Sequence, residues 1–358
     1  MSSSEVTGYA ARAVGCPLEP LTYPVPILGE HDVRVAVTHC GLCFTDLQAI
    51  DDFYRITTFP FVPGHEIVGH VEARGSAVSE LKEGDRVGIG WQGRSCGRCR
   101  WCVRSEVHLC YDIAEMGTWE RHGGFADSVT VDASFAYRLP SGLSSDVAAV
   151  LMCAGISVYA PLTRYAGEGR RVAIYGLGGL GHLAIQFAHA LGYEVTAFSS
   201  TTAKEQEARG FGADHFAVTG NRDRMRPLDF EFDLLLCTAH GDVDWQEMID
   251  LLEKRGRLVL VGFPEVSIWA RDLVSHEVSI TGSFLGNDAT MREMLSFAQV
   301  HGIAPRIERR PMTDVNDAIR RLKEGKVRYR VVLNHASSTG RLSDAIGPGT
   351  EELESPGT

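Results

Sequence analysis

Arg171-Val-Ala-Ile-Tyr-Gly-Leu-Gly-Gly-Leu-Gly-His182 is the stretch that decides the fold. Residues 171–175 form a short apolar run of the buried-strand type, and the run from residue 182 to residue 191 has helical apolar spacing. The glycines between them permit a tight turn and let a pyrophosphate approach the N-terminus of the helix. This setting predicts a dinucleotide site. The residues expected to contact the cofactor here are Gly176, Gly178, Gly179, Leu180 and Gly181.

The pattern of strand followed by helix continues on the C-terminal side of this motif. Residues 194–198, 233–237 and 257–261 read as buried strands, and residues 244–254 read as a helix between the last two. Alternation of this kind predicts an α/β fold with a parallel, doubly wound sheet.

The chain on the N-terminal side has a different character. Residues 1–90 contain short Val-rich segments separated by turn signals, which predicts a β-rich unit such as a small barrel or sandwich. Residues 91–125 are rich in Cys, Gly and Arg and read as a loop without strands.

The C-terminal part adds two helix-like stretches and a strand. The helices are expected at residues 289–301 and 314–324, and a closing strand is expected at residues 327–333. Residues 335–358 are rich in Ser, Gly, Pro and Glu, and we expect this tail to be disordered.

Bulk properties exclude several classes of protein. With 358 residues the chain exceeds one compact core, so two domains are expected. A net charge of -11 argues against nucleic acid or an anionic membrane as the main partner. No apolar run is judged long enough to span a bilayer, and the N-terminus lacks the features of a signal peptide, which favours the cytoplasm.

Four of the nine cysteines follow the pattern Cys-x2-Cys-x2-Cys-x7-Cys, at Cys96, Cys99, Cys102 and Cys110. Four thiolates that converge from one loop close a tetrahedron, which predicts a structural zinc. The alternatives are a disulfide pair or an iron–sulfur cluster. A ferredoxin-type run would have a three-residue gap and a following proline, which this sequence lacks.

A second set of residues has the composition of a catalytic zinc site. Cys43, His65 and Cys153 match the type with two cysteines and one histidine, which keeps a fourth position open. Glu66 could reach the metal when no substrate is bound, and Asp46 is expected to accept the imidazole N–H of His65. Wide separation weakens the set, because a single Cys or His is often only packed in a core. Glu66 could instead be a carboxylate that only supports a metal ligand or lies at the surface, and Asp46 could cap a helix.

The position that selects between NAD and NADP carries no acidic residue. Ser199, Ser200 and Thr201 stand about where a carboxylate would bind the ribose 2′-hydroxyl of NAD, and Lys204 follows. Hydroxyls and an ammonium suit a 2′-phosphate, so NADP(H) is favoured. The alternative is that these residues only cap and solvate the next helix.

Together these motifs resemble the zinc-dependent medium-chain alcohol dehydrogenases, and within them the cinnamyl alcohol dehydrogenase-like branch. The resemblance covers residues 10–334, and its most specific parts are residues 41–46, 63–66, 153–155 and 176–182 and the four-cysteine loop. It implies a GroES-like catalytic domain (residues 1–155 and 290–334) around a Rossmann domain (residues 156–289). It also implies two zinc ions per subunit and a homodimer.

Residue roles follow from the same resemblance. It implies that Cys43, His65 and Cys153 bind the catalytic zinc, with Glu66 as a resting-state ligand, and that Thr45 bonds the substrate oxygen and relays its proton. It adds Ser283 to the cofactor contacts. Trp91, Trp119 and Phe284 are implied as an aromatic substrate wall, although each could equally be a core residue.

Two positions depart from the family pattern. Phe44 stands where relatives usually carry Arg or His against the cofactor pyrophosphate, and Gln48 stands where many carry the His that ends the proton relay. Because Gln48 cannot titrate, the proton must leave by water or another group.

The sequence therefore predicts an NADP(H)-dependent zinc alcohol dehydrogenase or aldehyde reductase that acts on aromatic or medium-length primary alcohols and aldehydes. One alternative reduces iminium or conjugated C=C bonds on the same scaffold. Another is a catalytically silent protein that binds nucleotide or zinc.

Overall fold

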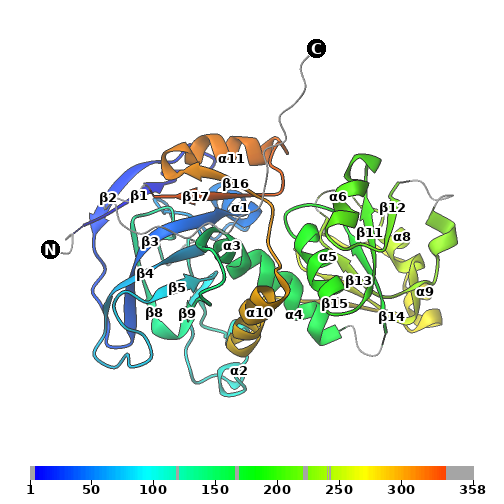
Figure 1. Cartoon of the computed structure of the whole chain (residues 1–358), viewed down its shortest axis with the longest axis horizontal. Helices are drawn as coiled ribbons and strands as arrows, with labels where there is room; N and C mark the ends of the chain where they lie inside the picture. The colour runs from blue at the N-terminus through cyan, green and yellow to red at the C-terminus, as the bar shows by residue number, and fades with distance from the viewer. Residues whose placement is uncertain are drawn as a thin grey trace, which may run out of the picture.

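The computed structural model describes residues 5–117, 121–165, 169–220, 225–239, 241 and 243–335. Figure 1 shows a β-rich lobe that contains strands from both ends of the chain, beside a lobe of alternating strands and helices.

The second lobe is built on the predicted glycine-motif strand. Its six-stranded sheet has the order β12-β11-β10-β13-β14-β15, and every pair is parallel. In chain order this is 3-2-1-4-5-6, the order of dinucleotide-binding sheets. Its strands are β10 (Arg171–Tyr175), β11 (Glu194–Ser199), β12 (His215–Val218), β13 (Phe232–Cys237), β14 (Leu252–Leu260) and β15 (Ser279–Gly282).

Helices cover both faces of this sheet, which explains the apolar run of β10. Val172 and Ile174 enter the core that contains Leu183 and Phe187 of α5, while Ala173 enters a separate core on the opposite face. The helices of this lobe are α5 (Gly181–Ala190), α6 (Glu205–Gly210), α8 (Trp245–Asp250) and α9 (Ala270–His276).

The first lobe confirms the β-rich, GroES-like prediction and joins both ends of the chain. Its sheet has the order β16-β17-β3-β4-β5-β9, with β8 also paired to β3. The C-terminal strand β17 runs antiparallel to β3, with Val332 opposite Gly41. These strands are β3 (Asp32–Leu42), β4 (Glu66–Arg74), β5 (Arg86–Ile89), β8 (Ser128–Asp132), β9 (Ala136–Arg138), β16 (Ile307–Pro311) and β17 (Arg330–Asn334).

Smaller elements complete this lobe. The strand pairs are β1 (Glu5–Ala10) with β2 (Glu19–Pro24), and β6 (Gln92–Arg94) with β7 (Ala114–Glu115). The helices are α1 (Phe44–Ile50), α2 (Arg100–Val103) and α11 (Val315–Lys323). Short 3-10 turns lie at Val107–Leu109, Ala133–Phe135, Thr202–Lys204, Arg226–Leu228 and Met312–Asp314.

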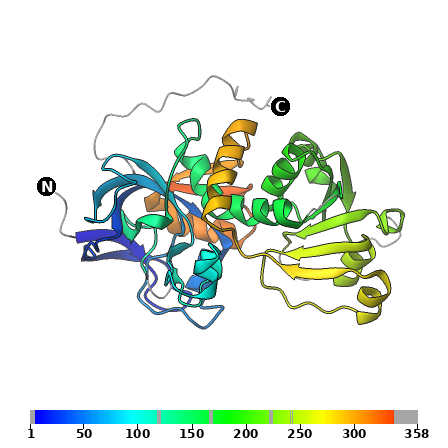
Figure 2. The same cartoon turned by 90° about the horizontal axis from the view of Figure 1, so that it is seen from below.

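A long apolar helix joins the lobes, as Figure 2 shows from below. It consists of α3 (Ser145–Val150), a π-helical turn (Leu151–Gly155) and α4 (Ile156–Tyr165), and α10 (Asp288–His301) packs against it. The expectation that no apolar run is long enough to span a bilayer is wrong by length and composition alone, because the 21-residue helix Ser145–Tyr165 contains an 18-residue window with a mean hydropathy of 1.6. Its most apolar window is 83% buried in the protein, as in a core helix.

Other elements differ from the prediction. The helix expected at residues 244–254 ends at Asp250, because Leu252 pairs with Phe232 in the sheet. The stretch at residues 91–125 holds β6, β7 and α2 rather than only loop. The closing strand begins at Arg330 rather than residue 327. Residues 336–358 of the tail that we expected to be disordered lie outside the described residues.

Candidate active site and zinc centres

The start of α1 fixes the first candidate zinc ligand. Cys43 precedes the helix, and its backbone N–H donates to Asp46 Oδ2 at 2.9 Å, which forms one half of a capping box. Asp46 therefore does have the helix-capping role that the sequence left open.

Asp46 also orients the second ligand. Its Oδ1 accepts from the Gly64 backbone N–H at 3.0 Å and lies 2.9 Å from His65 Nδ1. Burial lowers the pKa of His65, but the neighbouring Asp46 carboxylate outweighs burial and raises it above the usual value. The contact with Asp46 occupies Nδ1 of His65. The other ring nitrogen, Nε2, is buried and has no hydrogen-bond partner among the described residues. A metal ion is the partner that such a nitrogen fits.

Four potential ligands converge in this region of the first lobe. Cys43, His65, Glu66 and Cys153 each offer an atom, and these atoms all lie within 4.8 Å of one another. A hydrogen bond from Cys153 lowers the pKa of the Cys43 thiol well below its usual value, despite burial. The two sulfur ligands, of which Cys43 favours the thiolate form, and the imidazole of His65 are ligand types that zinc prefers. The π-helical turn widens the long helix at Cys153, a distortion that is frequent at functional sites.

Glu66 meets a residue that the sequence reading missed. Arg330, which is 4% exposed, donates from Nη2 to Glu66 Oε1, while Glu66 Oε2 is buried without a partner among the described residues. Burial raises the pKa of Glu66 to about 7, and Arg330 opposes that rise. The surface-carboxylate alternative for Glu66 is therefore wrong.

Arg330 also connects the candidate zinc site to the glycine motif. A methyl group added at Gly179 would lie 3.1 Å from Arg330 Nη1, so the guanidinium stands directly against the motif. The positive charge next to the expected pyrophosphate position therefore comes from Arg330 at the start of β17. Phe44, which stands where relatives usually carry Arg or His, is 40% exposed at the start of α1. The arginine that begins the apolar strand Arg330–Asn334 is the signal that could have revealed this positive charge.

Thr45 and Gln48 lie on the same short helix as the first ligand. Thr45 Oγ1 is 3.7 Å from Cys43 Sγ. Gln48 Oε1 accepts a hydrogen bond of 3.0 Å from the Tyr54 hydroxyl, and the Tyr54 ring meets Phe263 of the other lobe edge-on at 5.6 Å. Tyr54 was not identified from the sequence.

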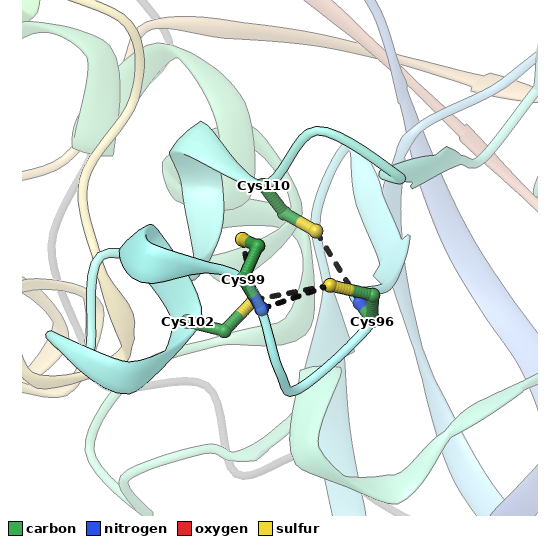
Figure 3. Close-up of side chains that lie close together, drawn as sticks. All are labelled: Cys96, Cys99, Cys102 and Cys110. Carbon is green, nitrogen blue, oxygen red and sulfur yellow. Dashed lines mark hydrogen bonds between the residues drawn. The ribbon is translucent and has the colours of Figure 1, made fainter.

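The four-cysteine loop forms a second ligand cluster, drawn in Figure 3. Cys99 Sγ lies 3.6 Å from Cys102 Sγ, and the Cys96 N–H donates to Cys110 Sγ at 3.3 Å. Backbone hydrogen bonds, first from Cys102, lower the pKa of Cys99 to about 6, which favours the thiolate. Four thiols without carboxylate or histidine fit a closed structural zinc site.

The nucleotide motif has the predicted backbone geometry. Gly176 has φ of +102°, and a Cβ there would lie 2.8 Å from the Ala239 backbone nitrogen. A Cβ on Gly181 would lie 1.9 Å from Gly176 oxygen, so neither position admits a side chain.

The expected 2′-phosphate residues are only partly accessible. Ser199 is buried at the end of β11, whereas Ser200 and Thr201 are exposed. Lys204 Nζ donates to the Leu177 carbonyl oxygen at 2.7 Å, so it lies over the glycine loop. Ser283 follows β15, and its buried hydroxyl has no partner within the described part of the chain.

Two of the three expected substrate-wall residues lie together. The Trp91 and Phe284 rings meet edge-on at 5.1 Å. Trp119 lies outside the described residues. Of the cysteines that belong to neither ligand cluster, Cys40 and Cys237 are buried and Cys16 is exposed.

Comparison with known proteins identifies two family matches. Residues 29–141 match the alcohol dehydrogenase GroES-like domain, and residues 179–300 match the zinc-binding dehydrogenase family. The chain is 35% identical to an aldehyde reductase of Synechocystis over 93% of this chain and 100% of that protein.

Two solved structures share the whole architecture. A cinnamyl alcohol dehydrogenase from Sorghum bicolor has a TM-score of 0.89 and 35% identity over 95% of this chain and 100% of that one. A Helicobacter pylori enzyme described as CAD, in complex with NADP(H), has a TM-score of 0.86 and 27% identity over 94% of this chain and 99% of that one.

Proposed function

This chain belongs to the zinc-dependent medium-chain alcohol dehydrogenases, in the cinnamyl alcohol dehydrogenase-like branch, and from that premise we propose an NADP(H)-dependent enzyme that interconverts primary alcohols and aldehydes. Aromatic or medium-length substrates are the proposed class. The observation that carries the proposal is the buried convergence of Cys43, His65, Glu66 and Cys153 next to the Thr45 hydroxyl.

The residues divide the chemistry between them. When bound, zinc supplies Lewis acidity towards the substrate oxygen, and NADPH supplies a hydride. Cys43, His65 and Cys153 would hold the metal, and Asp46 keeps the imidazole oriented through Nδ1. The Thr45 hydroxyl donates a hydrogen bond to the substrate oxygen and passes its proton to that oxygen when an aldehyde is reduced.

NADP(H) rather than NAD(H) is supported by charge. Ser200 and Thr201 are exposed beyond β11 with Lys204 close by, and no carboxylate stands among residues 199–204 to repel a 2′-phosphate. Because the Ser199 side chain is buried, we expect it to contribute less to 2′-phosphate binding than Ser200 and Thr201 do. The relative with NADP(H) bound supports the same assignment.

Domain organisation and assembly belong to the same proposal. The strand content supports a catalytic domain of residues 1–155 and 290–334 and a cofactor domain of residues 156–289. Exposed Trp269 and Val274 at α9, which precedes the edge strand β15 in the chain, support a homodimer, which a monomeric mass in sedimentation would contradict. A cytoplasmic location completes the proposal.

Reduction of an iminium or conjugated C=C bond is the second candidate. The observation that favours it is Gln48, which accepts from Tyr54 and cannot carry a proton away by titrating. The Thr45 hydroxyl beside Cys43 favours carbonyl reduction over this second candidate.

The test of the proposed function is NADPH oxidation measured against panels of aldehydes, imines and enals. We expect aldehydes to give the highest kcat/KM and NADPH to exceed NADH. Ser200→Asp places a charge against the 2′-phosphate and should lower kcat/KM for NADPH by about tenfold, whereas Ser200→Ala should change it little. A preference for NADH, with unchanged NADPH use in Ser200→Asp, would contradict the cofactor assignment.

Gln48→His is expected to add an ionisation to the pH profile of kcat/KM, near the reference histidine pKa of about 6.5. The introduced imidazole would take the place of an amide that cannot titrate and would exchange protons with solvent. Gln48→Asn, which has no titratable group, is the control. If the Gln48→His profile matches the wild-type profile, the proton leaves by a path that does not include this position.

A further inference from the structure

A cavity of about 530 Å³ lies in the β-rich lobe, apart from the catalytic cluster. Its polar lining consists of Asp32, Arg94, Arg121, His122, Ser128 and Thr130. None of the candidate zinc ligands and none of the glycine-motif residues line it. The proposed reaction leaves it without a role.

Two buried hydroxyls on one strand belong to residues that line this cavity. Ser128 and Thr130 are two positions apart on β8, so they share one face of the strand, while Val129 and Val131 belong to the core. Neither Oγ has a hydrogen-bond partner within the described part of the chain, and Thr130 is only 9% exposed. A buried hydroxyl without a partner destabilises the fold, and an acceptor atom of a bound ligand would satisfy it.

Two arginines from other segments bring positive charge to the same cavity. Arg121 is held in place, because its Nη1 donates to the Thr130 carbonyl oxygen at 3.0 Å, and among the described residues its other guanidinium N–H groups have no hydrogen-bond partner in the lining. Arg94, at the end of β6, is exposed, and among the described residues its guanidinium has no hydrogen-bond or ion-pair partner. Asp32, the one carboxylate among the described lining residues, accepts from the Gly29 backbone N–H at 3.1 Å.

His122 adds a further donor of defined tautomer. Its Nδ1 accepts from the Val62 backbone N–H at 3.2 Å, so the proton of the neutral ring lies on Nε2. The ring packs on Tyr23 with centroids 4.5 Å apart. Guanidinium, imidazole N–H and hydroxyl groups are all donors, and such a set recognises an acceptor that carries negative charge.

We propose that this cavity binds a small organic oxyanion, a carboxylate or a phosphate monoester, through Arg94, Arg121 and the hydroxyls of Ser128 and Thr130. The volume falls within the range of roughly 300–1,000 Å³ for small-molecule sites and exceeds what an inorganic ion fills. Tyr23 and Pro26 give the organic part an apolar wall.

Calorimetric titration of the full-length, zinc-loaded protein saturated with NADP(H) tests this proposal. Saturation removes the nucleotide site as a competing anion site. The probes are benzoate, phenyl phosphate and inorganic phosphate. We expect one of the two organic probes to bind more tightly than inorganic phosphate, and the better of the two distinguishes a carboxylate from a phosphate ligand.

Variants assign the binding to the cavity. Arg94→Gln and Thr130→Val should each weaken the better probe by about tenfold or more, because each removes a donor to a charged group. Arg98→Gln, an exposed arginine of the neighbouring loop outside the lining, should leave affinity unchanged. Absence of binding, or equal affinity in Arg94→Gln and wild type, would overturn the proposal. Because Arg94 is exposed, its variant is expected to fold even if Thr130→Val does not.

Discussion

Thr45→Val is expected to lower kcat by about 10²–10⁴-fold, the usual contribution of a positioned proton donor or acceptor. Valine keeps the shape of threonine but removes the hydroxyl 3.7 Å from Cys43 Sγ. The capping box of Asp46 and Cys43 holds α1 in place independently of the Thr45 side chain, so the ligand positions should persist. Steady-state kinetics should show a fall in kcat with a much smaller change in KM.

Thr45→Ser is the matched control, because it retains the hydroxyl and should recover most of the activity. Zinc content and melting temperature of the valine variant should equal those of the wild type. A valine variant with wild-type kcat would show that Thr45 is not the proton donor, even if the metal site is correct.

Cys102→Ser is expected to lower the free energy of unfolding by about 3 kcal/mol, a fall of about 4 °C in melting temperature for a chain of this size. Cys102 Sγ lies within 4.0 Å of Cys96 Sγ and 3.6 Å of Cys99 Sγ, so its loss opens the tetrahedral set. Oxygen is a poor substitute for thiolate towards zinc. Thermal unfolding followed by circular dichroism measures the change.

Cys16→Ser is the control for this variant, since Cys16 is exposed and belongs to neither ligand cluster. Its melting temperature should equal that of the wild type. If Cys102→Ser melts at the wild-type temperature, the loop at residues 96–110 keeps its structure without a metal, and the structural-zinc assignment fails.

Local features of the fold could be predicted from the sequence. Strand β10 has the predicted bounds, Arg171–Tyr175, because both of its faces are buried and its residues are apolar without interruption. The four-cysteine cluster was also readable, since all its ligands lie within one loop of 15 residues between Cys96 and Cys110.

Features that depend on distant contacts could not be predicted from the residues alone. Cys43, His65 and Cys153 are widely separated, so their residue types were weak evidence for a common site until the family resemblance supported it and the structure showed their convergence. Arg330 was missed because its partner Glu66 is 264 residues away. The cavity lined by Ser128 and Thr130 was missed for a related reason, because other residues of its lining, such as Tyr23 and Arg94, lie far from them in the sequence.

The central claim, a catalytic zinc held by Cys43, His65 and Cys153 in addition to a structural zinc, is tested most directly by counting zinc per chain in purified protein. The expected result is about two zinc ions for the wild type and about one for Cys43→Ser, with the remaining ion lost in Cys102→Ser combined with Cys43→Ser. About one zinc ion in the wild type, unchanged in Cys43→Ser, would contradict the catalytic site.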